Sequence, residues 1–474
     1  MHRLHGAGFP ASGHATRRRA PPGRTLLTIT LCAAAACSPP PPPLEPCRDC
    51  NVVLISVDTL RADHVGAYGY ARPTTPNIDA LAGRGIVFEN AIAQSSWTRP
   101  AHMSIFTGLH PREHGFVALR DSRRLEPEVP TIASVLAKNG WATAGFSGGV
   151  NMAASFGFGQ GFEVYRNNGK YFRDNFEDAR YWLDHNQQRR FFLFFHGYDA
   201  HTPYHSDSID RRAVGLTDPP PRRAMRRVCR KGKPTPKMDA YIDEYDAAVH
   251  RADRYVGKLI ADLERRGLLS RTIIVVLSDH GEEFLEHGRC FHVSTLHREV
   301  LQVPLIVVAP GLAPRRVKTL VPASVTVAPT LMQLVGIEDA PFPGPSLVAA
   351  ARGLGTRGES VVSETERGRD NGGDGHVRAL TGEDFKFIRW GMLNRSELYR
   401  IPDDSAEHHP VDNSWRRTQL SRQLEGWAEA HPPRFEPRRR GKPGGGRHAQ
   451  QEQREEDEAL KRREEQLRSL GYAD

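Results

Sequence analysis

Four short runs of apolar residues constrain the fold more than any other feature of this chain. They cover residues 52–57, 191–195, 272–277 and 303–308. A strand with one solvated face alternates apolar and polar side chains, whereas a strand covered by helices on both faces is apolar throughout. We therefore expect four buried, parallel strands in one sheet.

The sequence between these runs has helical periodicity. Within residues 245–265, apolar side chains recur close to every 3.6 residues, at Ala248, Ala252, Val256, Leu259 and Leu263. Alternating strands and helices predict an α/β fold in which a mostly parallel central sheet lies between helices. The 474 residues, of which 39% are hydrophobic, are enough for one large core with a small appended domain.

Polar residues follow three of the runs directly. Asp58 follows the first, His196 and Asp199 follow the second, and Asp279 with His280 follows the third. Any one of them could simply begin a turn. In open α/β sheets, however, ligands bind beyond the carboxyl ends of the strands, so three such coincidences predict a site at that edge.

Residues 96–108 read Ser-Trp-Thr-Arg-Pro-Ala-His-Met-Ser-Ile-Phe-Thr-Gly. This segment resembles the sulfatase signature Cys-x-Pro-x-Arg, with Thr98 at the cysteine position and His102 at the arginine position. Segments 51–63 and 278–282 resemble the two metal-binding segments of the same superfamily. The resemblance implies an alkaline-phosphatase-like sandwich. Because threonine cannot be oxidised to formylglycine, it also implies an unmodified hydroxyl nucleophile of the alkaline-phosphatase kind.

The same resemblance implies one divalent metal ion, with ligands Asp58, Thr98, Asp279 and His280. A mixed carboxylate and imidazole set suits Zn²⁺ or Mn²⁺ better than Ca²⁺, which remains an alternative. This chain departs from the family at two positions, with Thr59 in place of an aspartate and His280 in place of an asparagine. Both departures favour Zn²⁺ or Mn²⁺ over Ca²⁺. A second metal at Asp199 and His292 is the less favoured alternative, because relatives with two metals have a different spacing.

The nucleophile segment also has the pattern of a helix start. We expect Thr98 to cap a helix that Pro100 helps to begin and Gly108 ends. The Thr98 oxygen would then lie at the positive end of the helix dipole, where an alkoxide or a phosphoryl oxygen is favoured.

Several histidines have counterparts in the family. Residues 195–204 resemble Asp-Pro-His-x-Pro-Tyr, which implies that His201 donates a proton to the leaving group or clamps the substrate. Residues 291–304 resemble a second family segment, in which His292 faces the transferred group and His297 replaces a tyrosine. His102 would hold the nucleophile loop or neutralise charge. A structural hydrogen bond is the alternative for each, and the role of His287 stays open.

The N-terminal 36 residues resemble a lipoprotein signal peptide. Basic residues precede an apolar stretch at 26–36, and Ala34-Ala35-Ala36-Cys37 resembles a lipobox. We expect a lipid on Cys37 and a cell-envelope location, with simple cleavage and secretion as the alternative. Residues 37–50 read as a proline-rich linker that ends in Cys47 and Cys50, for which a disulfide is expected.

The remaining chain divides into a catalytic domain at 51–350, a small subdomain at 351–415 and a charged tail at 416–474. Short strand candidates at 361–365, 376–380 and 385–390 predict an antiparallel sheet in the subdomain. Residues 396–403 resemble the closing segment of that subdomain in sulfatases. The tail is expected to end in a helix.

These features together predict a metal-dependent hydrolase that cleaves phosphate mono- or diesters through a covalent threonyl intermediate on Thr98. Sulfate-ester hydrolysis without formylglycine, envelope phosphotransfer to lipid or glycan, and a non-catalytic binding lipoprotein are the alternatives. The net charge of +9 favours anionic partners only weakly. A small-molecule, glycan or lipid ester is the expected substrate, no nucleic-acid partner is expected, and the oligomeric state is open.

Overall fold

The computed structural model describes residues 44–118, 123–167, 169–216, 236–354, 358–366, 375–391 and 395–434. The expected signal peptide, the Cys37 anchor, the proline run and the terminal helix lie outside these ranges. Within them, none of the helices has the length and apolar character needed to cross a membrane. The expected disulfide between Cys47 and Cys50 is present just before the first strand.

The core is one eight-stranded sheet in the order β10-β2-β9-β6-β1-β5-β3-β4. Its strands are β1 (Asn51–Val57), β2 (Ile86–Ile92), β3 (Ala142–Phe146), β4 (Val164–Arg166), β5 (Phe191–Gly197), β6 (Thr272–Leu277), β9 (Leu305–Val308) and β10 (Arg315–Pro322). The expected α/β class with a mostly parallel central sheet is confirmed.

Strand β9 corrects one expectation. The run at 303–308 was expected to be parallel, yet β9 pairs antiparallel with both β6 and β2. An apolar run reports that both faces of a strand are buried, and it carries no information about strand direction. The other expected strands, β1, β5 and β6, pair in parallel as predicted.

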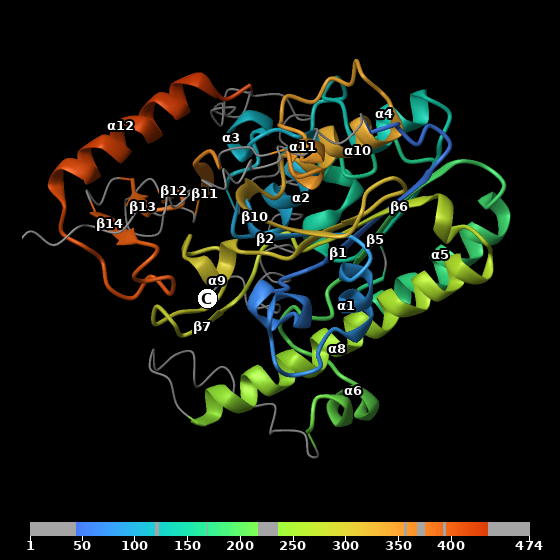
Figure 1. Ribbon diagram of the computed structural model, residues 1–474, viewed down its shortest axis with the longest axis horizontal. Helices are drawn as coiled ribbons and strands as arrows, with labels where there is room; N and C mark the ends of the chain where they lie inside the picture. The colour runs from blue at the N-terminus through green and yellow to red at the C-terminus, as the bar shows by residue number, and fades with distance from the viewer. Residues whose placement is uncertain are drawn as a thin grey trace, which may run out of the picture. The chain divides into compact units, whose positions relative to one another are not determined.

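Helices cover both faces of the sheet (Figure 1). One face packs against α1 (Pro76–Ala82), α5 (Phe172–Asn186) and α8 (Pro236–Arg265), and the other packs against α2 (Thr98–Thr107), α4 (Ile132–Lys138) and α10 (Val327–Val335). Alternate residues of β1 explain the two cores, since Val52 and Leu54 enter one cluster while Val53 and Ile55 enter the other.

Short elements connect these layers. They are the helices α3 (Pro111–His114), α6 (Ser208–Ala213), α9 (Arg298–Leu301) and α11 (Val348–Ala351), and the two-stranded sheet of β7 (Glu283–Phe284) and β8 (Cys290–Phe291). The β7–β8 pair and α9 both lie in the segment between β6 and β9. This segment carries several of the residues predicted to form the site.

A separate antiparallel sheet follows in the order β11-β12-β13-β14. Its strands are β11 (Val361–Glu366), β12 (His376–Thr381), β13 (Phe385–Trp390) and β14 (Arg395–Arg400). The start of the expected charged tail is in fact helix α12 (Ser414–Ala430), whose Leu420 and Leu424 pack on one face of this sheet. Weak amphipathicity explains why the helix was missed, because two leucines are its only buried side chains.

Candidate active site

The carboxyl ends of parallel strands bring the predicted residues together. Asp58 follows β1, His196 is the second-last residue of β5, and Asp279 and His280 follow β6. These strands are neighbours in the order β6-β1-β5, so their carboxyl ends share one edge of the sheet. Each of these four residues is fully buried.

Thr98 reaches the same edge from α2. It is the first residue of the helix, with Trp97 at the N-cap and Gly108 at the C-terminal stop in the left-handed conformation at φ 65°. The expectation that Thr98 itself caps the helix is therefore wrong by one residue. A hydroxyl in the first turn still lies at the positive end of the helix dipole, so the electrostatic consequence is unchanged.

The Thr98 hydroxyl lies between two of the predicted metal ligands. Thr98 Oγ1 donates to Asp58 Oδ2 at 3.3 Å and lies 3.4 Å from His280 Nε2. The other nitrogen of His280, Nδ1, bonds the Gly281 carbonyl at 2.9 Å. This bond makes Nδ1 the protonated nitrogen and leaves the Nε2 lone pair pointing to the site.

The donor set fits a divalent cation. Oxygen or nitrogen atoms of Asp58, Asp279 and His280 all lie within 4.8 Å of one another. Asp58 Oδ1 is buried and, among the residues that the structure describes, has no hydrogen-bond partner. A buried carboxylate oxygen without a donor is costly unless a cation satisfies it.

The electrostatics of the site point the same way. Burial, together with the nearby Asp279 and Glu282 carboxylates, raises the pKa of Asp58 well above its usual value. Burial also raises the pKa of Glu282 to about 8. For Asp279, burial alone would raise the pKa, but the His280 and His102 rings outweigh it and hold the pKa below its usual value. The three buried acids, Asp58, Asp279 and Glu282, repel one another when ionised, and a divalent cation bound among them would neutralise that charge.

His102 connects the nucleophile helix to the sheet. Its Nε2 bonds Ser56 Oγ on β1 at 2.8 Å, and its Nδ1 bonds the Thr98 carbonyl at 3.0 Å. The same Nδ1 lies 3.3 Å from Asp279 Oδ2. His102 thus contacts the first turn of α2, strand β1 and the residue that follows β6, and its expected role in holding the nucleophile loop stays a prediction.

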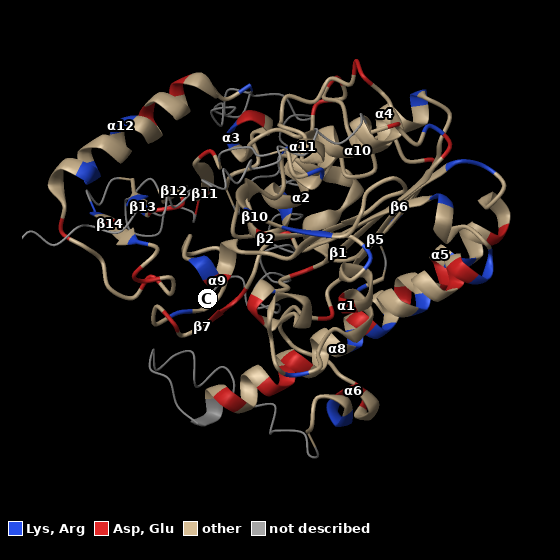
Figure 2. Cartoon of the chain, in the orientation of Figure 1, with Lys and Arg blue, Asp and Glu red and all other residues tan. Residues whose placement is uncertain are grey.

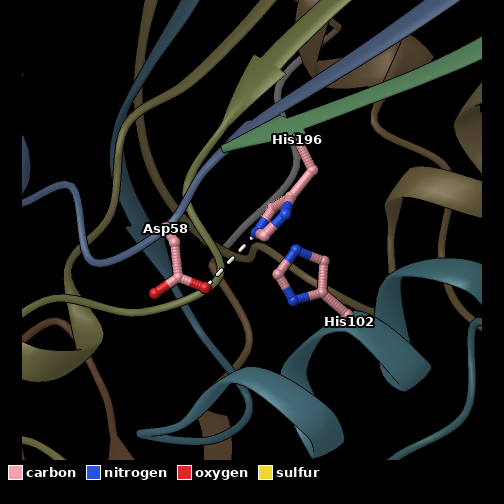
Figure 3. A group of neighbouring side chains, drawn as sticks. All are labelled: Asp58, His102 and His196. Carbon is pink, nitrogen blue, oxygen red and sulfur yellow. Dashed lines mark hydrogen bonds and ion pairs between the residues drawn. The ribbon is translucent and has the colours of Figure 1, made fainter. Parts of the chain in front are cut away.

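His196, which the sequence placed at this edge without assigning it a catalytic or metal-binding role, contacts the predicted metal ligand Asp58. Its Nε2 lies 3.3 Å from Asp58 Oδ2, and its ring lies edge-on to that of His102 with centroids 4.9 Å apart (Figure 3). Asp58, His102 and His196 form a second group whose ligand atoms lie within 4.8 Å of one another. The sequence signal was present, since His196 directly precedes the end of an apolar strand.

His201 and His292 lie against the metal-ligand side of the site. Their ring centroids are 5.1 Å apart, and the His292 ring is 4.5 Å from that of His280. His292 Nδ1 pairs with Glu282 Oε1 at 3.1 Å. Burial lowers the pKa of His201 well below its usual value and that of His292 to about 3, so both rings are neutral at pH 7. His201 Nδ1 donates to the Thr202 carbonyl at 2.5 Å, so the neutral ring has Nε2 as a hydrogen-bond acceptor and can donate to a substrate oxygen only after it takes up a proton.

Asp199 does not join this cluster. Asp199 Oδ2 accepts from the Phe172 amide at 2.7 Å, and Oδ1 lies 3.5 Å from Arg251 Nη1. This ion pair gives Asp199 a structural partner. The less favoured second metal at Asp199 and His292 therefore gains no support from the arrangement.

His287 and His297 form another cluster at the small sheet. Their rings stack with centroids 3.6 Å apart, and His287 Nδ1 pairs with Glu299 Oε1 at 2.6 Å. His297 Nε2 lies 3.2 Å from Glu397 Oε2 of β14. Ligand atoms of His287, His297 and Glu299 are within 4.8 Å of one another, but a short ion pair already occupies two of them. A structural role for His287 is the simpler interpretation.

The sulfatase family model matches residues 50–337, more than half of the chain. A Delta 4,5-hexuronate-2-O-sulfatase of Bacteroides thetaiotaomicron is 24% identical over 410 residues, 75% of this chain and 83% of that protein. Arylsulfatase K of Xenopus laevis is 23% identical over 317 residues, 56% of this chain. The chain spans only 59% of the length of that relative.

Solved structures show the same fold. A protein in complex with its substrate D-glucosamine-2-N,6-O-disulfate superposes with a TM-score of 0.68 at 19% identity, covering 81% of this chain and 97% of the other. The phosphonate monoester hydrolase of Agrobacterium radiobacter superposes with a TM-score of 0.65 at 18% identity, covering 81% and 96%. The matched domain contains the whole cluster around Thr98, and the chain belongs to the sulfatase family of ester-cleaving hydrolases.

Proposed function

We propose that this protein is a metal-dependent hydrolase of phosphate mono- or diesters, with Thr98 as the nucleophile. The observation that carries the proposal is the position of Thr98 Oγ1, 3.3 Å from Asp58 and 3.4 Å from His280 at the start of a buried helix. A threonine at this position cannot become formylglycine. Its own hydroxyl is therefore the group available for attack.

Asp58, Thr98, Asp279 and His280 are the residues that would hold the metal. Bound there, a divalent ion would lower the pKa of the Thr98 hydroxyl and withdraw charge from a phosphoryl oxygen. Two carboxylates with an imidazole suit Zn²⁺ or Mn²⁺ better than Ca²⁺. Sulfatase-family members depend on a metal, and the donor geometry above is compatible with one.

The side chains divide the remaining work. Asp58 Oδ2 accepts the Thr98 hydrogen bond, orienting an oxygen lone pair away from Asp58 and towards the substrate. As the bond from Thr98 Oγ1 to phosphorus forms, the hydroxyl proton passes to Asp58 Oδ2, and the leaving oxygen departs with the bonding electron pair and takes a proton from solvent. Water then attacks the phosphorus of the threonyl ester, Asp58 returns the proton to Oγ1, and the phosphate product leaves. Burial raises the pKa of Glu282 to about 8, so its carboxyl group donates to His292 Nδ1 and leaves the Nε2–H of the neutral His292 ring to donate to a phosphoryl oxygen. His102 keeps the first turn of α2 in place through Ser56.

A matched pair of variants tests the nucleophile. Thr98→Ser keeps a hydroxyl, whereas Thr98→Val keeps the shape and removes it. With Mn²⁺ or Zn²⁺ present, we expect Thr98→Ser to retain aryl phosphate turnover and Thr98→Val to lose it by a factor of about 10³ or more. Mass spectrometry of acid-quenched wild type should find a phosphorylated peptide that contains Thr98. Full turnover by Thr98→Val would exclude the mechanism.

Sulfate-ester hydrolysis is the second candidate function, because the two relatives described above are sulfatases. Aryl sulfate, phosphate, phosphodiester and phosphonate esters, compared by kcat/KM on one preparation, separate the two. A preference for sulfate that still depends on the Thr98 hydroxyl would keep the nucleophile and change the substrate class. Appearance of phosphate on an added lipid or glycan acceptor would indicate transfer instead.

The location of the enzyme is part of the proposal. The Ala-Ala-Ala-Cys sequence ending at Cys37 supports attachment to an envelope membrane through a lipid. Cell fractionation of wild type and Cys37→Ala tests it. We expect wild type in the membrane fraction and the variant in the soluble fraction, and equal distribution would reject the anchor.

A further inference from the structure

A basic groove lies between helix α12 and the small sheet. Its volume is about 370 Å³, and four arginines line it, namely Arg389, Arg395, Arg417 and Arg422. Hydroxyl groups of Ser396, Thr418 and Ser421 line it as well. Lysine and arginine positions occur on α12 and on the neighbouring strands (Figure 2). The Thr418 hydroxyl donates to the Ser414 carbonyl at 2.9 Å and Ser421 Oγ donates to Glu425 at 3.4 Å, so the groove combines positive charge with hydroxyl oxygens that can accept hydrogen bonds.

Two of the four guanidinium charges are not neutralised. Arg389 pairs with Glu425 at 2.7 Å, and Arg395 pairs with Glu397 at 2.6 Å. Arg417 and Arg422 have no carboxylate within 4.0 Å among the residues that the structure describes. The groove is left with about two net positive charges, which favours an anionic ligand.

Arg417 is held in a fixed position without losing its charge. Its Nη1 donates to the Ser396 carbonyl at 2.8 Å, and its Nη2 donates to the Val411 carbonyl at 3.0 Å. Its Nε is buried and has no hydrogen-bond partner within the described part of the chain. Neutral carbonyl partners preorganise the planar guanidinium, so little side-chain entropy is lost when an anion binds.

The strand register places this groove on the outer face of the small sheet. Phe387 pairs with Leu398 and Arg389 with Ser396, and the two apolar members pack against α12. The intervening residue Glu397 contacts His297, which precedes α9 of the catalytic domain. Side chains alternate between the two faces of a strand, so Arg389 and Ser396 are on the face turned away from His297, whereas Arg395 has the register of Glu397 and also lines the pocket of His287 and His297. The groove is separate from the site around Thr98.

We propose that this groove binds sulfate or phosphate groups of a polyanionic glycan. Arginine forks bind such groups through two parallel hydrogen bonds. Arg417, Ser421 and Glu425 recur every four residues along one face of α12, which suits a ligand extended along the helix. Glu425 disfavours a bare row of phosphates but accepts hydrogen bonds from sugar hydroxyls. The groove volume suits one or two sugar units.

Heparin is the probe for this site, and binding is measured by fluorescence anisotropy of a labelled heparin oligosaccharide at fixed salt. Arg422→Gln removes an exposed charge that has no described partner, so folding should be unaffected. Arg416→Gln is the matched control, because Arg416 lies on the same helix but does not line the groove. The basic run at 434–447 is retained in all variants, so differences between them report the groove.

We expect Arg422→Gln, and more strongly Arg417→Gln/Arg422→Gln, to weaken heparin binding roughly tenfold or more. Arg416→Gln should stay within about twofold, and neutral dextran should not compete. Equal heparin affinity of all variants would overturn the proposal. Single-stranded DNA that binds as tightly as heparin and competes with it would show that the groove binds polyanions in general. That result would also overturn the proposal. Aryl ester turnover is assayed in parallel, so failure of this site is distinguishable from failure of the proposed hydrolase activity.

Discussion

The His287–Glu299 ion pair should make the stability of this protein fall as the pH rises above neutrality. Burial alone would lower the pKa of His287, but Glu299 and Glu407 outweigh it and raise the pKa to about 9. His287 Nδ1 donates to Glu299 Oε1, and Nε2 donates to the Glu407 carbonyl at 2.8 Å. Both side chains of the pair are 12% exposed or less, so solvent screens them little.

The size and sign follow from the two pKa values. A pKa of about 9 in the folded chain against 6.5 in the unfolded chain corresponds to roughly 3 kcal/mol. Because the folded pKa is the higher one, the full contribution is present below pH 6.5. It is lost as the pH rises through about 9, where the folded protein gives up the proton.

Urea unfolding at intervals from pH 6 to pH 10 measures this contribution. Wild type should lose about 3 kcal/mol over that range relative to His287→Gln, whose profile lacks this component. The two profiles should converge near pH 10. Glu299→Gln is a second test, because removing the carboxylate takes away the main reason for the raised pKa. Parallel profiles for wild type and both variants would show that His287 is not charged in the folded protein.

Three further outcomes are expected. Asp58→Asn should lower bound metal per chain, measured by plasma mass spectrometry, and lower aryl phosphate turnover at least a hundredfold, whereas unchanged metal content would remove Asp58 from the ligand set. Lys386→Met should lower the free energy of unfolding in urea by about 3–5 kcal/mol, because both Glu407 carboxylate oxygens lose a buried partner at 2.9 Å. The double variant Lys386→Met/Glu407→Gln should recover part of that loss. His102→Arg restores the family residue but should lower the free energy of unfolding by about 1–3 kcal/mol and lower kcat. The reason is that Ser56 Oγ, 2.8 Å from His102, and the His196 ring occupy the space that the longer arginine side chain would need. Wild-type kcat in this last variant would contradict that packing argument.

The fold was largely predictable because its main signals are local. The apolar runs gave β1, β5 and β6, and the 3.6-residue period gave most of α8. Strand β2 escaped prediction because Glu89 and Asn90 interrupt its apolar pattern, and they are its half-buried residues. The direction of β9 depends on the path of the segment before it, which no periodicity records.

The site was predictable where its residues lie in segments that resemble the conserved segments of the sulfatase family. Asp58, Thr98, Asp279 and His280 meet at one edge because three strands end there and α2 begins there. The contact between His196 and Asp58 joins residues 138 positions apart through the β1–β5 pairing, so pattern alone could not assign it. The roles of the histidines remain predictions, as does the identity of the metal.

The reversed direction of β9 determines where the chain between β6 and β9 lies relative to this site. In an all-parallel sheet, the chain leaving β6 would have to cross a sheet face before entering the next strand from the opposite edge. Here the chain leaves β6 at Leu277 and enters β9 at Leu305 from the same edge. Residues 278–304 thus form one segment that begins and ends at the edge of the sheet where the candidate site lies. The length of this segment can therefore change around β7 and β8 while the pairing of β6 with β9 stays as it is.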